Sequence, residues 1–461
     1  MKMTLLGTGV RTPFVLHGLA NREAELGLTE VVLHDTDHER LRIMSALGAH
    51  LCREWSAGFT VRGEEDPRAA IAGSRFVFSA IRVGQEEARA DDERIALAHG
   101  VLGQETTGPG GFAMALRTIP AMLRYAELIT EVEPDALLVN FTNPVGVIVQ
   151  ALCDHSSVRV VGVCDGPIEM KRSVAGFLGV PPDQVYADYA GLNHAGWIHR
   201  VLVEGCDRLP EVLERYEELQ RTEESWALFD PELVRRIGML PMEYLYFFYS
   251  RDEAVQNILR SGGSRGEQIA KLNAPLWPEL AERIAADDLE GAREAWERTI
   301  ETRHETYFAR ERGEAVPEGA REEPPPHEEM FEGDGYEGLA TAVMVSAVQR
   351  RGMPLIVNAP NRGAIPDLLD TDVVEVTCMV DEHGAHPLAQ GHLPRHALEL
   401  IEPLKAYERL TVQAAVEGSY AKALEALTVH PLVGSEPLAR AILDDYLRVH
   451  GGLLAHIRGK E

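Results

Sequence analysis

The chain is short of positive charge. Its 461 residues include 45 Lys and Arg against 73 Asp and Glu, so the formal net charge at pH 7 is −28. Nucleic acids and anionic membranes attract basic surfaces. The charge balance therefore argues against either of them as a partner. A phosphorylated small molecule could bind only where positive side chains are gathered locally.

Cysteine is also scarce, and long apolar runs are missing. The five cysteines (Cys52, Cys153, Cys164, Cys206 and Cys378) are widely spread and form no CxxC pair, which is the usage of a reduced protein. No segment is apolar for the roughly eighteen residues that a transmembrane helix needs. The N-terminus lacks the basic region and cleavage site of a signal peptide. We therefore expect a cytoplasmic protein.

The first third of the chain alternates short apolar runs with helical stretches, which is typical of a parallel α/β sheet. The predicted strands are residues 3–6, 31–33, 76–80, 136–140 and 158–163. In a doubly wound sheet, ligands bind at the carboxyl ends of the strands. We predict a Rossmann-like NAD-binding domain over residues 1–165, with its functional residues just after the strands.

The pattern changes beyond residue 165. Polar stretches at 210–224 and 279–312 predict helices with solvated charges, and the Pro- and Glu-rich stretch 315–332 predicts a loop. After these we expect a helix, a strand, a strand pair and C-terminal helices, at 339–348, 355–358, 373–380 and 397–461. The fold class is α/β, with the parallel sheet followed by a mixed α+β domain over 166–461. We expect that second domain to bind substrate and metal.

A glycine loop follows the first predicted strand. Gly7-Thr8-Gly9 allows a tight turn that brings backbone N–H groups against a pyrophosphate, although the third glycine of the usual fingerprint is missing. Asp35 ends the second strand, where a carboxylate can accept the ribose hydroxyls of NAD. The alternatives are a plain βα turn for the glycines and a helix N-cap for Asp35. Together these residues favour NAD.

Cys164 and His194 are a possible pair of metal ligands. Cys164 follows a predicted strand in VGVCDGP, and His194 closes GLNH further along the chain. Borderline transition metals prefer thiolate and imidazole. Two protein ligands leave coordination positions open for substrate oxygens or water. Spacing alone does not establish the site, because a chain with five Cys and 17 His yields such pairs by chance.

Several polar residues stand at predicted strand ends. Arg11 and Arg82 carry guanidinium groups that suit a phosphate of the cofactor or of a sugar, although each could instead pair with a carboxylate. Asn140 and Asn143, in NFTNP, offer donors and acceptors for sugar hydroxyls or a carboxamide, or else form an Asx turn. The glycine-dense stretch 101–111 predicts a loop beside a ligand.

An aromatic cluster, PMEYLYFFY, spans residues 241–249. Such a stripe is more often part of a core than of a catalytic site. A tyrosine close to a divalent metal can nevertheless have its pKa lowered enough to act as a base. The cluster therefore has both a structural and a catalytic interpretation.

Taken together, these segments resemble the family 4 glycoside hydrolases, the NAD- and metal-dependent group of 6-phospho-glycosidases and α-galactosidases. The matching segments are, in chain order, GTG, SAIRVG, HGVLGQETTGPGG, NFTNP, VGVCDGP, GLNH, PMEYL and VNAPNRGAIP. Carried over position by position, the resemblance implies a cofactor site of Gly7, Gly9, Val10, Arg11, Asp35, Arg82 and Asn140, substrate contacts from Arg82, Asn143 and Asn193, metal ligands Cys164 and His194, and catalytic residues Tyr244 and Asp165. It also implies a homodimer or homotetramer.

The resemblance implies a redox-elimination mechanism. NAD⁺ oxidises the sugar at C3, and Mn²⁺, chelated by the sugar's O2 and O3, polarises the ketone. The C2 proton becomes acidic, Tyr244 removes it, and the aglycone leaves. Water then adds, and NADH returns the hydride. The cofactor is therefore expected to be recycled and not consumed.

The sugar specificity is less clear from the sequence. Asp165 stands where many β-specific members carry Asn, and by resemblance to α-specific members it could be the general acid. The sequence around Arg11 and Pro167 looks more like the 6-phospho-β-glucosidase branch. We expect a 6-phospho-β-glucosidase first, and a 6-phospho-α-glucosidase or a non-phosphorylated α-glycosidase as alternatives.

Two alternatives come from other classes of protein. An ordinary NAD-dependent sugar or hydroxy-acid dehydrogenase would explain Gly7, Gly9 and Asp35 equally well. It would leave Cys164 and His194 unexplained. A non-catalytic nucleotide sensor would bind NAD without turnover.

Overall fold

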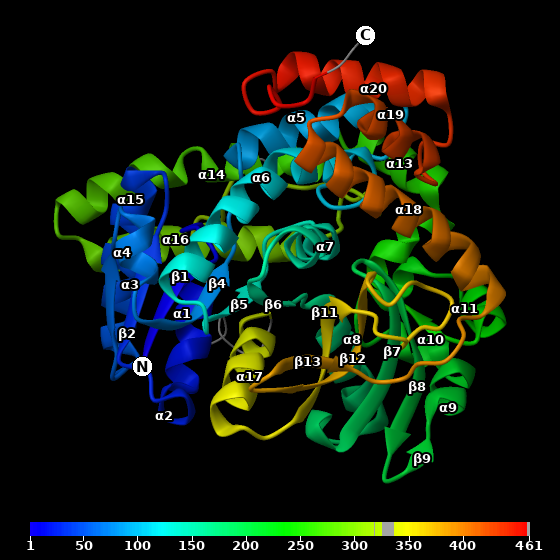
Figure 1. Cartoon of the computed structure of the whole chain (residues 1–461), viewed down its shortest axis with the longest axis horizontal. Coiled ribbons are helices and arrows are strands. Elements are labelled where there is room, and N and C mark those ends of the chain that lie inside the picture. The colour runs from blue at the N-terminus through cyan, green and yellow to red at the C-terminus, as the bar shows by residue number, and fades with distance from the viewer. Residues whose placement is uncertain (318, 325–335, 459–461) are drawn as a thin grey trace.

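A single mixed sheet of 13 strands forms the centre of the molecule (Figure 1). The computed structural model describes residues 1–317, 319–324 and 336–458. Along the sheet the strands lie in the order β10-β8-β7-β12-β11-β6-β5-β4-β1-β2-β3, with β13 beside β12 and β9 beside β8. One end of this order is parallel and the other antiparallel.

The parallel half consists of β1 (Lys2–Leu6), β2 (Glu30–His34), β3 (Thr60–Gly63), β4 (Ser74–Ser79), β5 (Leu137–Asn140) and β6 (Arg159–Gly162). Neighbouring strands pair in parallel, in the order 3-2-1-4-5-6 of dinucleotide-binding sheets. The prediction of a Rossmann-like parallel sheet is confirmed. β3 was not predicted, because its residues are mostly exposed and form no apolar run.

The antiparallel half consists of β7 (Val185–Leu192), β8 (Ala195–Val203), β9 (Cys206–Asp207), β10 (Leu240–Pro241), β11 (Met353–Pro360), β12 (Val373–Asp381) and β13 (Gly384–Pro387). It joins the parallel half where Asn358 of β11 pairs with Gly162 of β6. One sheet therefore continues past residue 165, and the domain boundary there stays a prediction. The predicted strand pair around residues 373–380 is confirmed, since β12 pairs with β13 in antiparallel orientation. β12 also lies between β11 and β7.

Helices cover the parallel half of the sheet and make up much of the remaining chain. The first half contains α1 (Thr12–Asn21), α2 (Glu23–Leu26), α3 (His38–Glu54), α4 (Pro67–Ile71), α5 (Gln85–Ala98), α6 (Pro109–Val132), α7 (Val145–His155) and α8 (Gly166–Leu178). The middle contains α9 (Leu209–Glu214), α10 (Tyr216–Leu219), α11 (Pro231–Ile237), α12 (Tyr246–Tyr249), α13 (Arg251–Arg260), α14 (Arg265–Asn273), α15 (Leu276–Ala285) and α16 (Leu289–Glu305), with 3₁₀ turns η1 (Pro182–Gln184), η2 (Trp226–Leu228) and η3 (Glu243–Leu245). The last part contains α17 (Tyr336–Gln349), α18 (Arg395–Glu417), α19 (Tyr420–Val429) and α20 (Glu436–Val449).

Two predicted helices are each divided in the structure. The stretch 279–312 forms α15 and α16, because Asp287 adopts a left-handed φ of 59° and Asp288 then caps α16 by accepting a hydrogen bond from the Gly291 N–H at 3.0 Å. The stretch 210–224 forms α9 and α10, which meet at Arg215. The predicted loop at 315–332 lies partly outside the described residues.

The C-terminal helices lie against the helices of the first half. Figure 1 shows α18, α19 and α20, in orange and red, over α5 and α6. One continuous cluster of buried apolar side chains includes residues from both halves of the sheet and from these helices. Among the described residues, no helix is long and apolar enough to cross a membrane.

Candidate active site

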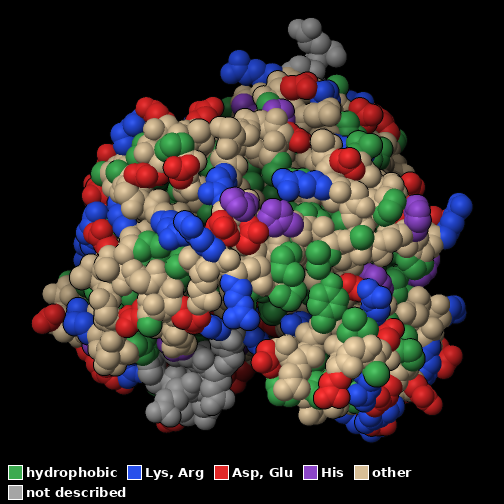
Figure 2. Space-filling model, turned by 60° about the horizontal axis from the view of Figure 1, so that its bottom comes forward, with side chains coloured by type: hydrophobic (Ala, Val, Ile, Leu, Met, Phe, Trp, Pro, Cys, Tyr) green, Lys and Arg blue, Asp and Glu red, His purple; other side chains and the backbone are tan. Residues whose placement is uncertain are grey.

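A large cavity opens at the carboxyl ends of the parallel strands. Its volume is about 1560 Å³, which exceeds the ~300–1,000 Å³ typical of a pocket for one small ligand. On the face in Figure 2, Lys, Arg and His side chains gather near the middle beside acidic ones. The loops after β1, β2, β4, β5 and β6 all contribute to the cavity wall. This position agrees with the expectation that functional residues follow the strands.

The glycine loop forms one end of the cavity. Gly7 has a φ of 93°, and a Cβ there would lie 2.8 Å from the carbonyl of Ala80, so only glycine allows this loop to pack on the end of β4. A Cβ at Gly9 would meet nothing within 4 Å. The missing side chain at Gly9 therefore leaves room for a ligand. Val10 and Arg11 line the same wall.

Asp35 lies beside this loop at the end of β2. Its Oδ2 accepts hydrogen bonds from the N–H of Thr8 at 2.6 Å and from the Thr8 hydroxyl at 3.1 Å. The N-cap of α3 is Asp37, which accepts from the N–H groups of Glu39 and Arg40 at 3.1 Å. The N-cap alternative for Asp35 is therefore wrong. Asp35 instead holds the loop and still lines the cavity.

Cys164 and His194 line the same cavity, although 30 residues separate them in the sequence. Cys164 comes two residues after β6, and His194 lies in the two-residue turn between β7 and β8 with a φ of 64°. A left-handed φ is uncommon outside glycine, and the tight hairpin requires it here. The Thr106 hydroxyl lies 2.7 Å from Nδ1 of His194, which leaves Nε2 as the nitrogen available to a metal.

Burial controls the protonation of both groups. It raises the pKa of the Cys164 thiol well above its ordinary value, and the neighbouring carboxylates Glu375 and Asp165 act in the same direction. It lowers the pKa of His194 to about 4. The imidazole is therefore neutral at pH 7, as coordination requires. A bound cation would reverse the balance at the thiol, because a coordinating thiol loses its proton.

Tyr244 lies against His194. Its ring stacks on the His194 ring with centroids 4.0 Å apart and an angle of 9° between the planes. Its hydroxyl is 3.2 Å from that of Tyr307, which donates a 2.6 Å hydrogen bond to Glu243. Burial and the Glu243 charge raise the pKa of Tyr244 well above its ordinary value, while the Tyr307 contact lowers it. A nearby divalent cation would also lower it. The other two tyrosines of the predicted aromatic cluster, Tyr246 and Tyr249, do not line the cavity.

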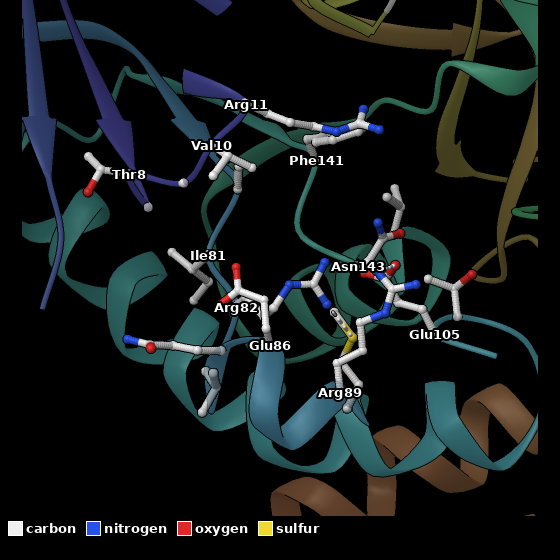
Figure 3. Close-up of a pocket in the computed structure, with 18 of the residues that line it drawn as sticks. Thr8, Val10, Arg11, Ile81, Arg82, Glu86, Arg89, Glu105, Phe141 and Asn143 are labelled. Atoms are coloured by element: carbon white, nitrogen blue, oxygen red, sulfur yellow. Dashed lines mark hydrogen bonds and ion pairs between the residues drawn. The ribbon is translucent and has the colours of Figure 1, made fainter. Parts of the chain in front are cut away.

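The two predicted phosphate-binding arginines have carboxylate neighbours. Arg82 donates to Glu105, which also pairs with Arg89 at 2.7 Å. Although burial alone would raise the pKa of Glu105, the two arginines hold it well below its ordinary value. Arg11 lies 3.8 Å from Asp165. Figure 3 shows these side chains in the same cavity as Thr8 and Asn143. Both arginines therefore have the carboxylate neighbours that the sequence analysis gave as the alternative to phosphate binding.

Two further arginines in the cavity were not predicted. Arg265 begins α14, and its guanidinium donates to uncharged oxygens, those of Gln268 at 2.9 Å and Thr306 at 2.6 Å. Arg303 lies near the end of α16. Burial and the neighbouring arginines Arg11, Arg265 and Arg89 lower its pKa well below the ordinary value. No carboxylate of the described residues makes an ion pair with either group. The sequence signal for Arg265 is the glycine-rich segment SGGSRG, whereas Arg303 is hidden in a stretch that predicts a solvated helix.

The predicted asparagines have three different environments. Asn143 lines the cavity, and its side-chain oxygen is buried without a hydrogen-bond partner in the described protein, so a ligand could satisfy it. Asn140 is fully buried and its amide donates to the carbonyl of Thr142 at 3.1 Å, a local turn contact away from the cavity wall. Asn193 does not line the cavity. It donates to Glu375 at 3.2 Å and contacts the Cys164 side chain.

The predicted loop at 101–111 forms part of the same wall. Gln104, Glu105 and Thr106 line the cavity, while Pro109 begins α6. The end of this stretch is therefore helical, which the glycine content concealed. A Cβ at Gly110 would lie 2.2 Å from the Gln104 carbonyl oxygen, so these glycines allow the loop to pack on the first turn of α6.

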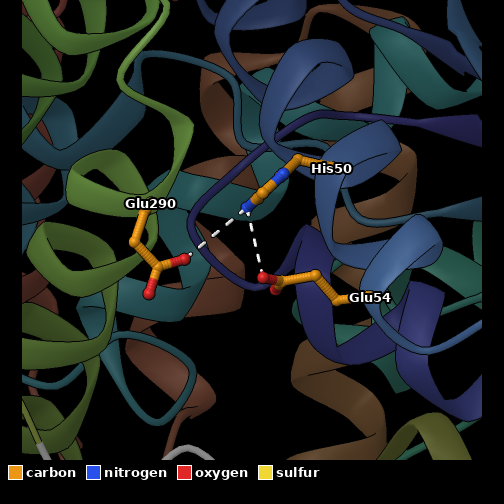
Figure 4. Close-up of side chains that lie close together, drawn as sticks. All are labelled: His50, Glu54 and Glu290. Carbon is orange, nitrogen blue, oxygen red and sulfur yellow. Dashed lines mark ion pairs between the residues drawn. The ribbon is translucent and has the colours of Figure 1, made fainter.

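A second cluster with metal-binding side chains lies elsewhere. His50 and Glu54 of α3 and Glu290 of α16 place one ligand atom each within 4.8 Å of one another (Figure 4). Arg293 already contacts both carboxylates, and none of the three residues lines the cavity. We assign no function to this cluster.

The fold and the cavity define a class of protein: an enzyme with a dinucleotide-binding sheet, whose glycine loop and thiol–imidazole pair share one cavity. The model described as "Family 4 glycosyl hydrolase" matches residues 2–180, and the model of the family's C-terminal domain matches residues 189–433. The chain belongs to glycosyl hydrolase family 4. The resemblance inferred from the motifs is confirmed.

Curated relatives and solved structures are similar to this chain over almost its whole length. A probable 6-phospho-β-glucosidase of Bacillus subtilis (strain 168) is 32% identical over 476 residues, which cover 100% of this chain and 98% of that protein. The 6-phospho-β-glucosidase of Thermotoga maritima, solved with manganese, NAD⁺ and glucose-6-phosphate, has a TM-score of 0.79 at 26% identity, covering 98% and 99% of the two chains. A 6-phospho-α-glucosidase from gut microorganisms, solved with NAD and glucose-6-phosphate, has a TM-score of 0.80 at 25% identity, covering 98% of each chain.

Proposed function

We propose that this protein is an NAD- and Mn²⁺-dependent 6-phospho-glucosidase, with 6-phospho-β-glucosides as its first substrates. The observation that carries the proposal is one cavity in which the glycine loop, the Cys164–His194 pair and unpaired arginines meet. Each part suits a different ligand: a dinucleotide, a divalent metal and a sugar phosphate. Its volume of about 1560 Å³ leaves room for a dinucleotide and a sugar together.

The residues at the strand ends fit NAD. Gly7 and Gly9 keep the backbone of the loop open to a pyrophosphate, and Asp35 offers its carboxylate to the ribose hydroxyls. A carboxylate at this position would repel the 2′-phosphate of NADP. Val10, Arg11 and Arg82 complete the proposed cofactor site.

The thiol and imidazole fit a divalent transition metal, and manganese is the metal in the structure of the Thermotoga maritima relative. Cys164 and His194 would hold it, Asn193 and Thr106 would orient these ligands, and the sugar would fill open positions. When bound, the cofactor and the metal supply reversible oxidation of the sugar and electrophilic polarisation of the oxidised carbon.

The unpaired arginines fit the 6-phosphate. In a protein of net charge −28, Arg265 and Arg303 are half-buried neighbours, and neither makes an ion pair with a carboxylate of the described residues. Two neighbouring cations favour an anionic ligand, and a phosphate dianion supplies the counter-charge with a geometry that guanidinium groups match. Arg11 and the unsatisfied oxygen of Asn143 lie on the same cavity wall and would contact the sugar phosphate as well.

Tyr244 and Asp165 are the proposed catalytic residues, and both line the cavity. Tyr244, stacked on His194, is proposed to remove the proton at C2 of the sugar. Asp165 follows Cys164 directly and lines the cavity, so it is proposed to protonate the leaving group. Removal of the C2 proton and departure of the aglycone then occur within one enclosed site.

The β preference rests on relatives and on sequence context. The Bacillus subtilis and Thermotoga maritima relatives carry 6-phospho-β-glucosidase names, while other relatives are 6-phospho-α-glucosidases. We also propose a cytoplasmic, homo-oligomeric enzyme. The five free cysteines support a reduced environment.

A substrate panel tests the proposal. Nitrophenyl α- and β-glucosides, each with and without a 6-phosphate, are assayed with NAD⁺, Mn²⁺ and a reductant that protects the thiol. We expect turnover of the 6-phospho-β-glucoside in preference to the other three compounds. Preference for the α-anomer would correct the linkage, and preference for an unphosphorylated glucoside would contradict the phosphate site.

A further inference from the structure

The proposed function assigns no role to Tyr307, although this residue lies in the cavity close to Tyr244. It follows the last turn of α16, lines the cavity and is 43% exposed within it. Its hydroxyl donates to the Glu243 carboxylate at 2.6 Å and lies 3.2 Å from the hydroxyl of Tyr244. Because a phenol has a single proton to donate, the Tyr307 hydroxyl donates either to Glu243 or to Tyr244. A Tyr244 that has lost its proton to act as a base would accept this hydrogen bond.

The ring of Tyr244 is held by aromatic contacts that do not fix its oxygen. It stacks on His194 at 4.0 Å and meets the edges of Phe247 and Phe308 at centroid distances of 5.8 and 5.6 Å. Flat stacking fixes the ring plane but resists sliding within that plane only weakly. The hydrogen bond to Tyr307 is the contact that sets where the phenol oxygen lies.

Tyr307 is itself held firmly. Glu243 precedes Tyr244 in the chain, so the carboxylate that anchors Tyr307 belongs to the same 3₁₀ turn as the phenol that Tyr307 contacts. Phe308 adopts a left-handed φ of 57°, which is costly for an aromatic residue. Its ring stacks on Phe247 at 5.4 Å, and this contact keeps the turn in a shape that directs Tyr307 into the cavity.

We propose that Tyr307, anchored by Glu243, is a positioning residue that fixes the phenol oxygen of Tyr244 for removal of the C2 proton. The proposal rests on the proposed function of Tyr244 as the base. A general base must lie within about 2.6–3.2 Å of the proton it removes, and a misplacement of about 1 Å can cost on the order of 10²-fold in rate.

The variant Tyr307→Phe tests the positioning role, and the isotope effect of deuterium at C2 reports directly on the bond that Tyr244 is proposed to break. Tyr307→Phe keeps the ring and removes the hydroxyl. We expect kcat to fall by about 10- to 10²-fold, with a larger isotope effect on kcat for substrate deuterated at C2, because breaking that bond becomes more rate-limiting. NAD⁺ and Mn²⁺ affinities, measured by calorimetry, should stay within a factor of about two.

A second pair of variants addresses the anchor. Glu243→Gln keeps an oxygen that can accept from Tyr307, whereas Glu243→Leu removes it. We expect Glu243→Gln to retain most of the activity and Glu243→Leu to resemble Tyr307→Phe. The matched control is Tyr246→Phe in the same cluster, whose hydroxyl donates to the Glu311 carbonyl at 3.3 Å and which should keep wild-type kinetics.

Solvent exchange at C2 and the kinetics of Tyr307→Phe together distinguish a failure of the positioning role from a failure of the proposed function. A wild-type enzyme that places solvent deuterium at C2, together with a Tyr307→Phe variant of unchanged kcat or unchanged isotope effect, would overturn the positioning role alone. A wild-type enzyme that exchanges nothing at C2 would overturn the base assignment of Tyr244, and the positioning role with it.

Discussion

At the scale of single residues, the cavity brings together groups that are far apart in the sequence. Cys164, His194 and Tyr244, which the family motifs single out, all line this cavity. Arg303 was missed because charged residues in a helical stretch are usually solvated. Arg265 was missed because the glycine-rich segment SGGSRG was given no function, and only the tertiary fold brings the two residues to the cavity. Asn140 was predicted from a motif match, and its contact with Thr142 shows that a motif can also serve a turn.

Loss of the thiolate should remove the metal. We expect Cys164→Ser to weaken Mn²⁺ binding by at least tenfold, because a hydroxyl is a poorer ligand than a thiolate, and to abolish turnover. Chelation with EDTA should inactivate the wild type until Mn²⁺ is restored. Calorimetric titration with Mn²⁺ measures the first effect. Full activity of Cys164→Ser in the presence of chelator would contradict the assignment.

Arg265 should govern the preference for phosphorylated sugars. Arg265→Ala removes one of the unpaired cations, so we expect kcat/KM for the 6-phosphorylated substrate to fall by about 10- to 10²-fold, corresponding to the ~1.5–3 kcal/mol of a charged hydrogen bond. NAD⁺ affinity should be unchanged. Arg283→Ala, which removes an exposed partner of Glu279, is the control. If both variants have the same substrate preference as the wild type, the phosphate binds elsewhere.

At the scale of secondary-structure elements, the sequence predicts most of the parallel strands and the late antiparallel strands β11 and β12, but not the antiparallel hairpin of β7 and β8. The parallel strands are short apolar runs that end in polar or glycine loops, and this is a local signal. The hairpin of β7 and β8 is apolar on both faces, and its turn, Asn193-His194, has no glycine. The pairing of β7 with β12 joins residues far apart in the sequence, such as Gly191 and Glu375, and no local pattern contains such a pairing.

A glycine in α6 gives an element-scale prediction. A Cβ at Gly110 would lie 2.2 Å from the carbonyl oxygen of Gln104, so Gly110→Ala should force that loop to move and destabilise the protein by about 1–3 kcal/mol. Gly176→Ala in α8, where a Cβ meets nothing within 4 Å, should be neutral or stabilising by up to about 1 kcal/mol. Urea denaturation of both variants measures the difference. Equal stabilities would contradict the packing described for the loop.

At the scale of the whole molecule, the C-terminal helix is tied to the first half through a buried carboxylate. Asp92 of α5 accepts from Arg117 of α6 at 2.9 Å and lies 2.8 Å from His450 at the end of α20. Arg117 also donates to the Val83 carbonyl at 2.8 Å, in the loop that carries Arg82. The same ion pair therefore connects the C-terminal helices with the cavity wall.

Breaking this ion pair should be costly. Arg117→Met leaves Asp92 buried without its main counter-charge, so we expect a loss of about 3–5 kcal/mol in the free energy of unfolding. The matched control is Arg68→Met, which removes a pair with Glu131 whose side chains are 52% and 63% exposed, and should cost less than about 1 kcal/mol. Urea denaturation measures the free energy of unfolding of both variants. A similar small loss in both would show that the Arg117–Asp92 pair does not stabilise the packing of the C-terminal helix on the first half of the chain.

We propose that the sugar is oxidised at C3, loses its C2 proton and regains its hydride from NADH within one turnover. The most direct measurement is hydrolysis of a nitrophenyl 6-phospho-β-glucoside in D₂O, with the product analysed by NMR and NADH followed at the same time. We expect deuterium at C2 of the product and no net NADH over many turnovers. A product without deuterium, or NADH that rises one-for-one with substrate consumed, would contradict it.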